Sequence, residues 1–251
     1  MITKITSKQN EKIKYFNQLK DSSFRNKEKL FMVEGFHLVD MALERGCVKT
    51  LISLTPYKEE LNDIEQIIVT EEILEKLSST KTPQGIIAIC KMDSFINEVL
   101  GDKVLYLDDI QDPGNLGTII RTALAFSFKD IILSSHCCSI YNPKVIAASQ
   151  GAIFFINFIN GNIDNLIELK EKGYQIVVTN LRNSVSLSKY QPENKQIIVL
   201  GNEGKGVCEE IINLASINVR INISNIDSLN VGIAAGIMMN DANERTRKWI
   251  I

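Results

Sequence analysis

Long hydrophobic runs are missing from this chain of 251 residues, in which no uninterrupted apolar segment approaches the roughly 18 residues that a membrane-spanning helix needs. The first residues, MITKITSKQNEKIKYF, carry charges and no apolar core, so we expect no signal peptide. The composition, 45% hydrophobic and 23% charged, is typical of a globular protein. We therefore expect a cytoplasmic protein that has no membrane partner.

Histidine and cysteine are also scarce. The two histidines, His37 and His136, are too few for a histidine-based metal site or catalytic triad. The five cysteines follow no zinc-binding or redox spacing, and their odd number argues against a disulfide framework. We therefore expect reduced, mostly buried thiols and no bound metal.

Positive charge is concentrated at the start of the chain, although the net charge of the whole is only −2. Residues 1–30 contain eight lysines and arginines and three acids, so this segment carries +5 and the remainder −7. Such a segment can attract a phosphate backbone, and Lys8, Lys12 and Arg25 are its candidate RNA contacts. The alternative is an ordinary solvated, lysine-rich helix.

Short helices and strands alternate over residues 1–92, which predicts a small α/β domain. We expect helices at 8–20, 36–44 and 71–77, and strands at 31–33, 48–54, 67–69 and 86–90. Residues 93–102 are predicted to be a linker. They are not rich in proline or glycine, so the boundary is uncertain by several residues.

Stronger alternation follows over residues 103–251. Near-continuous apolar strands are expected at 104–107, 131–133, 154–158, 175–178, 196–200 and 218–223. Helices are expected at 115–126, 143–150, 164–171, 209–215 and 231–247. This pattern predicts an α/β/α domain in which helices cover both faces of a parallel sheet.

Three segments of this second domain carry candidate chemistry, and the first is 115–121 (NLGTIIR). At 100° per residue one apolar stripe should face the core, formed by Leu116, Ile119, Ile120 and Ala123. Arg121 lies off this stripe between Gly117 and Ala125, so its guanidinium should stand in a shallow notch that another molecule can approach. Asn115 is the expected N-cap. An ordinary surface arginine is the alternative.

The second segment, 200–206 (LGNEGKG), is a strand that ends in a glycine-rich turn around Glu203. Glycine permits a close backbone approach to a ligand, but the spacing is neither the Rossmann fingerprint nor the P-loop. A plain strand-to-helix connection is equally compatible. The third segment, 228–236 (SLNVGIAAG), places Ser228 and Asn230 before a helix that is apolar almost all round and is therefore expected to be buried. N-capping by Ser228 is the simple interpretation.

In order and spacing the three segments resemble the motifs of the SpoU/TrmH family of RNA ribose 2′-O-methyltransferases. The matched positions are Asn115 and Arg121, then Gly201, Glu203 and Gly206, then Ser228 to Val231. Gly232 stands where the family often has serine. Residues 1–92 resemble the family's small substrate-binding domain, which has a ribosomal-protein-like α/β fold.

The resemblance implies that residues 103–251 form a catalytic domain with a deep trefoil knot. It implies a homodimer with the site at the subunit interface, and S-adenosylmethionine held near Thr179, Leu200, Gly201, Ile221 and Leu229. Asn115, Arg121, Glu203, Ser228 and Asn230 would be the catalytic set. In the family's scheme Arg121 activates the ribose hydroxyl. Because a guanidinium stays protonated, gripping the neighbouring RNA phosphate is physically easier.

The expected activity is methylation of a ribose 2′-hydroxyl, with 23S ribosomal RNA as the favoured substrate because of the N-terminal domain. A transfer-RNA 2′-O-methyltransferase is the close alternative. A non-catalytic RNA-binding or ribosome-assembly factor of the same fold is another, although the complete catalytic set speaks against it. A Rossmann-type nucleotide enzyme lacks its glycine fingerprint.

Overall fold

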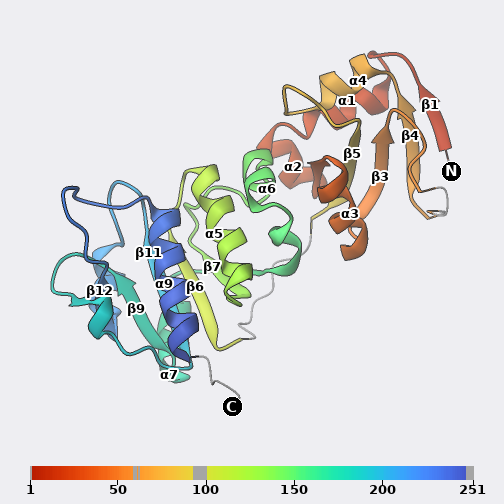
Figure 1. Ribbon diagram of the computed structural model, residues 1–251. Coiled ribbons are helices and arrows are strands. Elements are labelled where there is room, and N and C mark those ends of the chain that lie inside the picture. The colour runs from red at the N-terminus through yellow and green to blue at the C-terminus, as the bar shows by residue number, and fades with distance from the viewer. Residues whose placement is uncertain (1, 59–60, 62, 93–100, 247–251) are drawn as a thin grey trace. The chain divides into compact units, whose positions relative to one another are not determined.

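A computed structural model describes residues 2–58, 61, 63–92 and 101–246, and the chain divides into two compact units (Figure 1). Unit 1 comprises Met1–Ser94 and Tyr141–Phe154, and unit 2 comprises Phe95–Ile140 and Phe155–Ile251. Most of the predicted linker, residues 93–100, lies outside the described residues. Residues 141–154 differ from the expected division because they pack with unit 1, where the rings of Tyr141 and Phe31 are 4.7 Å apart.

Unit 1 is built on a five-stranded mixed sheet in the order β1-β4-β3-β5-β2. Its strands are β1 (Ile2–Ile5), β2 (Leu30–Glu34), β3 (Val48–Ser53), β4 (Glu65–Val69) and β5 (Ile86–Lys91). Its helices are α1 (Glu11–Gln18), α2 (Ser22–Glu28), α3 (Phe36–Arg45), α4 (Glu71–Leu77) and α6 (Pro143–Ser149). The sequence pattern does not predict β1 or α2, and the helix predicted at 8–20 is longer at both ends than α1.

The core of unit 1 joins α1 and α4 to the sheet. Ile13 and Phe16 from α1 and Ile73 from α4 are buried against strand residues such as Ile52 and Ile87. The alternate strand residues are buried as well, and α3 packs against β2, β3 and β5. The predicted small α/β domain therefore has helices packed closely on its sheet.

Unit 2 contains a seven-stranded sheet in the order β10-β12-β9-β11-β6-β7-β8, and every neighbouring pair is parallel. Its strands are β6 (Lys103–Asp108), β7 (Asp130–Leu133), β8 (Asn157–Asn160), β9 (Gln175–Thr179), β10 (Val185–Ser186), β11 (Gln196–Gly201) and β12 (Ile217–Arg220). The strand expected at 154–158 begins later, because Ala152–Phe155 forms a 3-10 turn, η1. A second 3-10 turn, η2, spans Leu187–Lys189.

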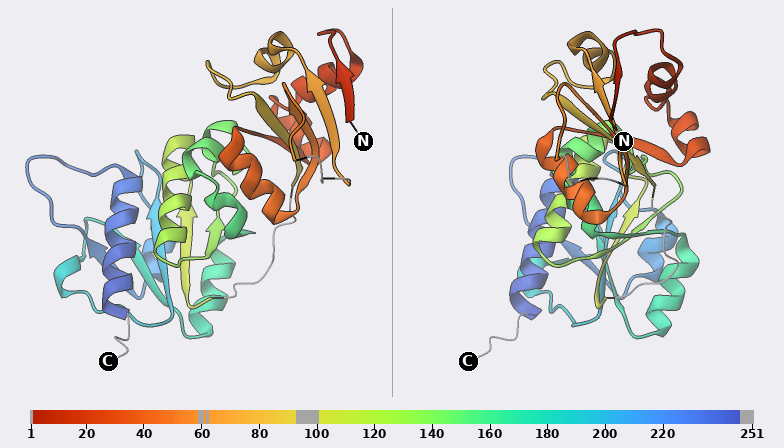
Figure 2. Two further views of the ribbon diagram at one scale, coloured as in Figure 1. Left: turned by 45° about the vertical axis from the view of Figure 1, so that its right-hand side comes forward. Right: turned by 90° about the vertical axis from the view of Figure 1, so that its right-hand side faces the viewer.

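Helices cover both faces of this sheet, as the sequence predicts. The helices α5 (Pro113–Ala125) and α9 (Val231–Thr246) lie side by side on one face, and α7 (Ile163–Glu171) and α8 (Glu209–Leu214) cover the other (Figure 2). The two helices α5 and α9 approach closely, since a Cβ added to Gly232 would lie 3.3 Å from the Thr118 side chain. The predicted burial of α9 is wrong for one side of it: Ile233 is 57% exposed and Ile237 36%.

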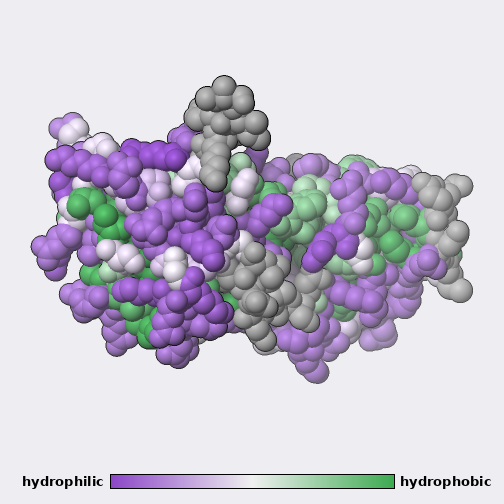
Figure 3. Space-filling view, turned by 90° about the horizontal axis from the view of Figure 1, so that it is seen from below, coloured by the Kyte–Doolittle hydropathy of each residue, from purple (hydrophilic) through white to green (hydrophobic). Residues whose placement is uncertain are grey.

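Hydrophilic side chains dominate the face of the molecule drawn in Figure 3, with hydrophobic patches between them, as is normal for a folded surface. In the part of the chain that the structure describes, each helix is too short or too polar to span a bilayer. Cys47 and Cys90 are buried as expected, whereas Cys208 is exposed.

Candidate active site

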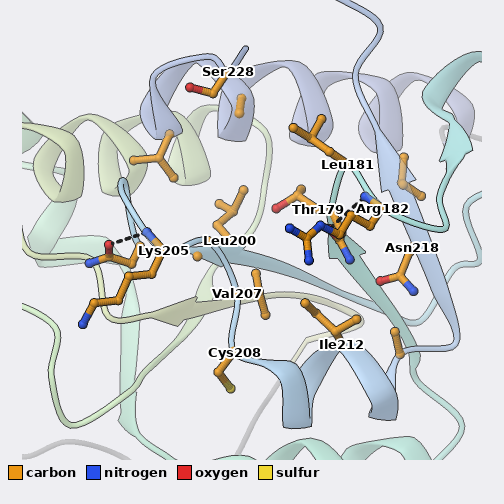
Figure 4. A pocket seen from close by; sticks show the side chains of 18 of the residues that line it. Thr179, Leu181, Arg182, Leu200, Lys205, Val207, Cys208, Ile212, Asn218 and Ser228 are labelled. Carbon is orange, nitrogen blue, oxygen red and sulfur yellow. Dashed lines mark hydrogen bonds between the residues drawn. The ribbon is translucent and has the colours of Figure 1, made fainter.

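A cavity of about 990 Å³ lies in unit 2, where β9, β11 and β12 end (Figure 4). In a parallel sheet the carboxyl ends of the strands share one edge, where loop backbone is free to bind a ligand. The expected cofactor residues all line this cavity: Thr179, Leu200, Gly201, Ile221 and Leu229. Glu203 and Ser228 line it too, so two of the three motif segments meet here.

The glycine-rich turn after β11 forms one wall of the cavity. A Cβ on Gly201 would lie 2.2 Å from the backbone of Gly206, so only glycine allows the turn to fold back this tightly. Asn202, which the sequence analysis did not single out, holds the turn in shape. Its Oδ1 accepts from the main-chain N–H groups of Gly204 and Lys205 at 2.9 and 3.0 Å, a geometry typical of an Asx turn. Its amide also donates to the Asp109 carbonyl at 2.9 Å.

A chain of polar side chains connects the three motif segments. Asn115 Nδ2 donates to Glu203 Oε1 at 3.0 Å, and Asn230 Nδ2 donates to Asn115 Oδ1 at 2.8 Å. Asn230 Oδ1 in turn accepts from the Gly232 N–H at 2.9 Å. Residues 88 and 115 positions apart in sequence are thus tied directly, and the network fixes the glycine turn against the N-termini of α5 and α9.

Two expected helix caps are wrong. Asp112 rather than Asn115 caps α5, since Asp112 Oδ1 accepts from the Asn115 N–H at 2.8 Å. The helix begins earlier because Pro113 has the fixed φ that suits a first helical position. Asn230 rather than Ser228 caps α9. Both Ser228 and Asn230 are exposed, contrary to the burial expected of them.

Arg121 is exposed on α5, off a stripe whose members are all fully buried as predicted. It does not line the cavity. Within the described part of the chain its guanidinium makes no hydrogen bond or ion pair. A single chain therefore joins Asn115, Glu203 and Asn230 by hydrogen bonds and places Glu203 and Ser228 on the cavity wall, whereas Arg121 takes part in neither.

The cavity suits S-adenosylmethionine in size and in chemistry. Asn218 Oδ1 is buried without a hydrogen-bond partner in the described structure, and it points into the cavity (Figure 4). A buried acceptor of this kind is costly unless a ligand donates to it, and the adenine amine is such a donor. Arg182 and Glu209 offer opposite charges to the amino-acid part of the molecule. Sequence analysis did not single out either Asn218 or Arg182.

Cysteine is a poor candidate nucleophile in this cavity. Cys208 lies on the wall, and burial is the largest of the causes that raise the pKa of its thiol. The thiol therefore stays protonated at neutral pH, and a protonated thiol is a weak nucleophile. Among the residues the structure describes, there is no group of three or more His, Cys, Asp or Glu side chains placed to hold a metal.

The basic residues expected to bind RNA behave differently from one another in unit 1. Lys8 pairs with Glu72 at 3.0 Å, and Lys12 pairs with Glu65. Arg25 is buried, with only 4% of its surface exposed. Its guanidinium donates to the carbonyls of Leu19 and Lys20 at 2.9 Å each. The prediction that Arg25 contacts RNA is therefore wrong, because this side chain holds the end of α1 inside the fold.

Family comparisons agree with this geometry. A model of the SpoU rRNA methylase family matches residues 102–240, and a model of the MRM3-like substrate binding domain matches residues 10–88. The chain is similar to the 23S rRNA (guanosine(2553)-2′-O)-methyltransferase RlmP of Bacillus subtilis, with 32% identity over 94% of this chain and 97% of the relative.

Solved structures give the same result. The fold is similar to that of an AdoMet-bound rRNA methyltransferase from Sinorhizobium meliloti, with a TM-score of 0.89, 29% identity, and coverage of 98% of this chain and 99% of the other. An RNA 2′-O ribose methyltransferase has a TM-score of 0.83 at 25% identity, covering 96% of this chain and 98% of its own.

Proposed function

The chain belongs to the SpoU rRNA methylase family, and we propose that it methylates a ribose 2′-hydroxyl of 23S ribosomal RNA with S-adenosylmethionine as the methyl donor. The observation that carries this proposal is the hydrogen-bonded chain Glu203–Asn115–Asn230 beside the cavity, since it unites all three motif segments. The substrate-binding domain at residues 10–88 and the relatives' names favour ribosomal RNA over transfer RNA.

The donor, when bound, supplies an electrophilic methyl group, and the residues of this chain have to orient it and the ribose. The glycine turn presents main-chain groups of residues 200–206 to the donor, and Asn218 Oδ1 accepts from it. Asn115 keeps the carboxylate of Glu203 and the amide of Asn230 in one place. Rigid placement of this kind is the main way in which a protein accelerates a displacement between two bound groups.

Arg121 contributes positive charge in this proposal rather than acting as a base. Its guanidinium has a planar, bidentate donor geometry that suits a phosphate. A grip on the phosphate beside the target ribose would position the 2′-hydroxyl and stabilise charge that develops there. The exposed position of Arg121, without a partner in the described chain, leaves it available for this contact.

A homodimer explains why Arg121 and the cavity are separate in one chain. Ile233 and Ile237 are one turn apart on the exposed side of α9, which lies beside the α5 helix that carries Arg121. A second copy packed on α5 and α9 would bury these isoleucines and set Arg121 of one protomer towards the cavity of its partner. The proposal also includes the knot in unit 2, a domain boundary at residues 93–102, a metal-free reaction and a cytoplasmic location.

The test is methyl transfer from tritiated S-adenosylmethionine by the purified full chain. We expect label in 23S ribosomal RNA or its ribosomal subunit and none in transfer RNA. A 2′-O-methyl group blocks alkaline cleavage, so a gap in the hydrolysis ladder identifies the nucleotide. Donor binding by calorimetry without label in any RNA would overturn the activity. Sedimentation of Ile233→Asp against wild type tests the dimer, which the new charge should dissociate.

A further inference from the structure

Unit 1 carries an exposed aromatic pair that the site in unit 2 does not use. Phe36, the first residue of α3, is 46% exposed. The ring of half-buried Tyr57 lies beside it, with centroids 5.6 Å apart and planes inclined by 48°. Lys58 Nζ lies 5.3 Å from the centroid of the Tyr57 ring. Two rings and an ammonium group thus share one patch of surface, hereafter the aromatic patch (Phe36, Tyr57 and Lys58).

Buried or half-buried polar groups hold this patch in place. The Tyr57 hydroxyl and the Lys58 ammonium both donate to Asp40 Oδ1, at 2.7 and 2.5 Å. Gln66, 1% exposed, accepts from the Tyr57 N–H at 3.1 Å and donates to the Lys58 carbonyl at 3.3 Å. These four bonds fix a segment of chain whose side chains contribute little to the core, so a role on the surface accounts for them better than stability does.

The loop that contains Ser78, Ser79 and Gln84 is also fixed by hydrogen bonds and close contacts. Glu34, directly before the turn that leads to Phe36, accepts from the Ser78 hydroxyl at 2.5 Å and from the Ser79 N–H at 2.6 Å. Gly35 has a φ of +91°, and a Cβ at this position would lie 2.7 Å from the Gln84 side chain. The Gln84 side chain therefore packs directly against the turn at Gly35. Exposed hydroxyls and Lys81 on this loop extend the polar surroundings of the rings.

We propose that the aromatic patch is a stacking surface for an unpaired base of the RNA that unit 2 methylates. The proposal rests on the proposed function, and it names the part of unit 1 that takes the substrate. Aromatic side chains recognise single-stranded RNA by stacking on the flat face of a base, and neighbouring lysines attract its phosphates. The exposed Phe36 ring offers a face for the base, and Lys58, whose ammonium lies over the neighbouring Tyr57 ring, offers a positive charge beside it. The match of residues 10–88 to a substrate-binding domain supports unit 1 as the part of the chain that takes the proposed RNA substrate.

The competing occupants are a protein partner and a second copy of this chain. A protein surface would bury Phe36 in an apolar pocket and would gain from its area alone, so leucine could replace it. A base needs the π face, so leucine should bind poorly. Phe36→Leu therefore separates the two kinds of partner, and Phe36→Ala removes the side chain for both.

The experiment measures the affinity of the full chain for a fluorescein-labelled single-stranded 20-nucleotide RNA, and for the same strand with abasic riboses. Base stacking is worth about 1–3 kcal/mol per base by alanine substitution, so Phe36→Ala should weaken binding of the normal strand roughly 5- to 150-fold. Phe36→Leu should recover little of this loss, and Tyr57→Phe, which keeps the ring, should stay close to wild type. Neither Phe36→Ala nor Phe36→Leu should change the affinity for the abasic strand.

Phe155→Ala is the matched control, because Phe155 is 44% exposed and lies in unit 2. Circular dichroism and donor binding in unit 2 confirm that each variant is folded. Equal losses on normal and abasic strands, full binding by Phe36→Leu, or no loss in Phe36→Ala would each overturn the stacking surface. These results leave methyl transfer by the wild-type chain untouched, so failure of the patch and failure of the proposed function are distinguishable.

Discussion

Unit 1 and unit 2 differ in how they use some of their positive side chains. In unit 1 three lysines of the basic segment and the lysine of the aromatic patch form ion pairs: Lys8–Glu72, Lys12–Glu65, Lys14–Glu11 and Lys58–Asp40. In unit 2 the side chains of Arg121, Arg182 and Lys205 make no ion pair with any other residue that the structure describes. Several cations of the basic segment are thus paired with acids, whereas these three cations of the acidic remainder of the chain are not.

This difference shows why the net charge of a segment is a poor guide to its binding residues. The +5 of residues 1–30 includes a buried arginine and two lysines, Lys8 and Lys12, that pair with acids from later in the chain. Exposed pairs of this kind are worth about 0–1 kcal/mol, so a phosphate can replace the acid at little cost. The cations near the site in unit 2 have no such competitor, and they should contribute more to substrate binding per residue.

The largest expected effect is at Arg121. Arg121→Ala should lower methyl transfer about 10²- to 10³-fold, because an aligned donor that stabilises developing charge is worth that much. Donor affinity should stay within twofold of wild type, since Arg121 does not line the cavity of its own chain. Single-turnover methylation and calorimetry measure the two quantities. Lys172→Ala is the control, because Lys172 is exposed on the opposite helix layer. A large loss of donor affinity in Arg121→Ala would contradict the role in gripping RNA.

Arg25 provides the reverse test in unit 1. Arg25→Met should lower the free energy of unfolding by about 2–3 kcal/mol, because it leaves the carbonyls of Leu19 and Lys20 without their charged donor. Urea unfolding followed by circular dichroism measures this loss. RNA affinity, measured where both proteins are folded, should not change. If Arg25→Met kept full stability and lost RNA binding, the basic segment would be an RNA-binding surface after all, and the contrast between the units would fail.

The fold was predictable wherever side-chain pattern decides it. Apolar runs identified β6 and β11, and the buried stripe of α5 followed from helical periodicity alone. Edge elements were missed: β1 has an alternately exposed pattern with no apolar run, and β10 is two residues long. The run 154–158 was assigned to a strand because Phe154 and Phe155 are apolar, but a 3-10 turn buries Phe154 equally well.

The site was predictable only in part, because its contacts join distant segments. Resemblance to the family identified Asn115, Glu203 and Asn230, but no spacing rule shows that they are hydrogen-bonded to one another. The exposure of Ile233 could not follow from a helix whose residues are apolar on every side. Asn218 had no signal at all, since a polar residue in a strand near the sheet edge is ordinary until its partnerless oxygen is seen inside a cavity.

Asn218 tests the proposed S-adenosylmethionine site in the cavity of unit 2. Asn218→Ala should weaken S-adenosylmethionine binding about 5- to 10-fold, which is the value of one hydrogen bond to a buried acceptor. Calorimetry measures this loss directly. Asn213→Ala is the matched control, since Asn213 also lines the cavity but is exposed to water. Equal affinity in Asn218→Ala and wild type would show that the donor leaves this oxygen unsatisfied, and would remove Asn218 from the proposed site.

The smallest effect is expected at Lys8. Its substitution tests whether a lysine that is paired with an acid in the fold can still bind RNA. Lys8→Ala should cost less than about 1 kcal/mol of stability, because its pair with Glu72 is exposed. If RNA phosphates displace Glu72, the variant should bind single-stranded RNA about two- to threefold more weakly at low salt, and the slope of log affinity against log salt should fall by up to one. Glu72→Gln should act in the opposite direction, since it frees the lysine. Identical salt slopes in both variants and wild type would mean that Lys8 does not contact RNA. The RNA-binding cations would then have to be sought outside the ion pairs of unit 1.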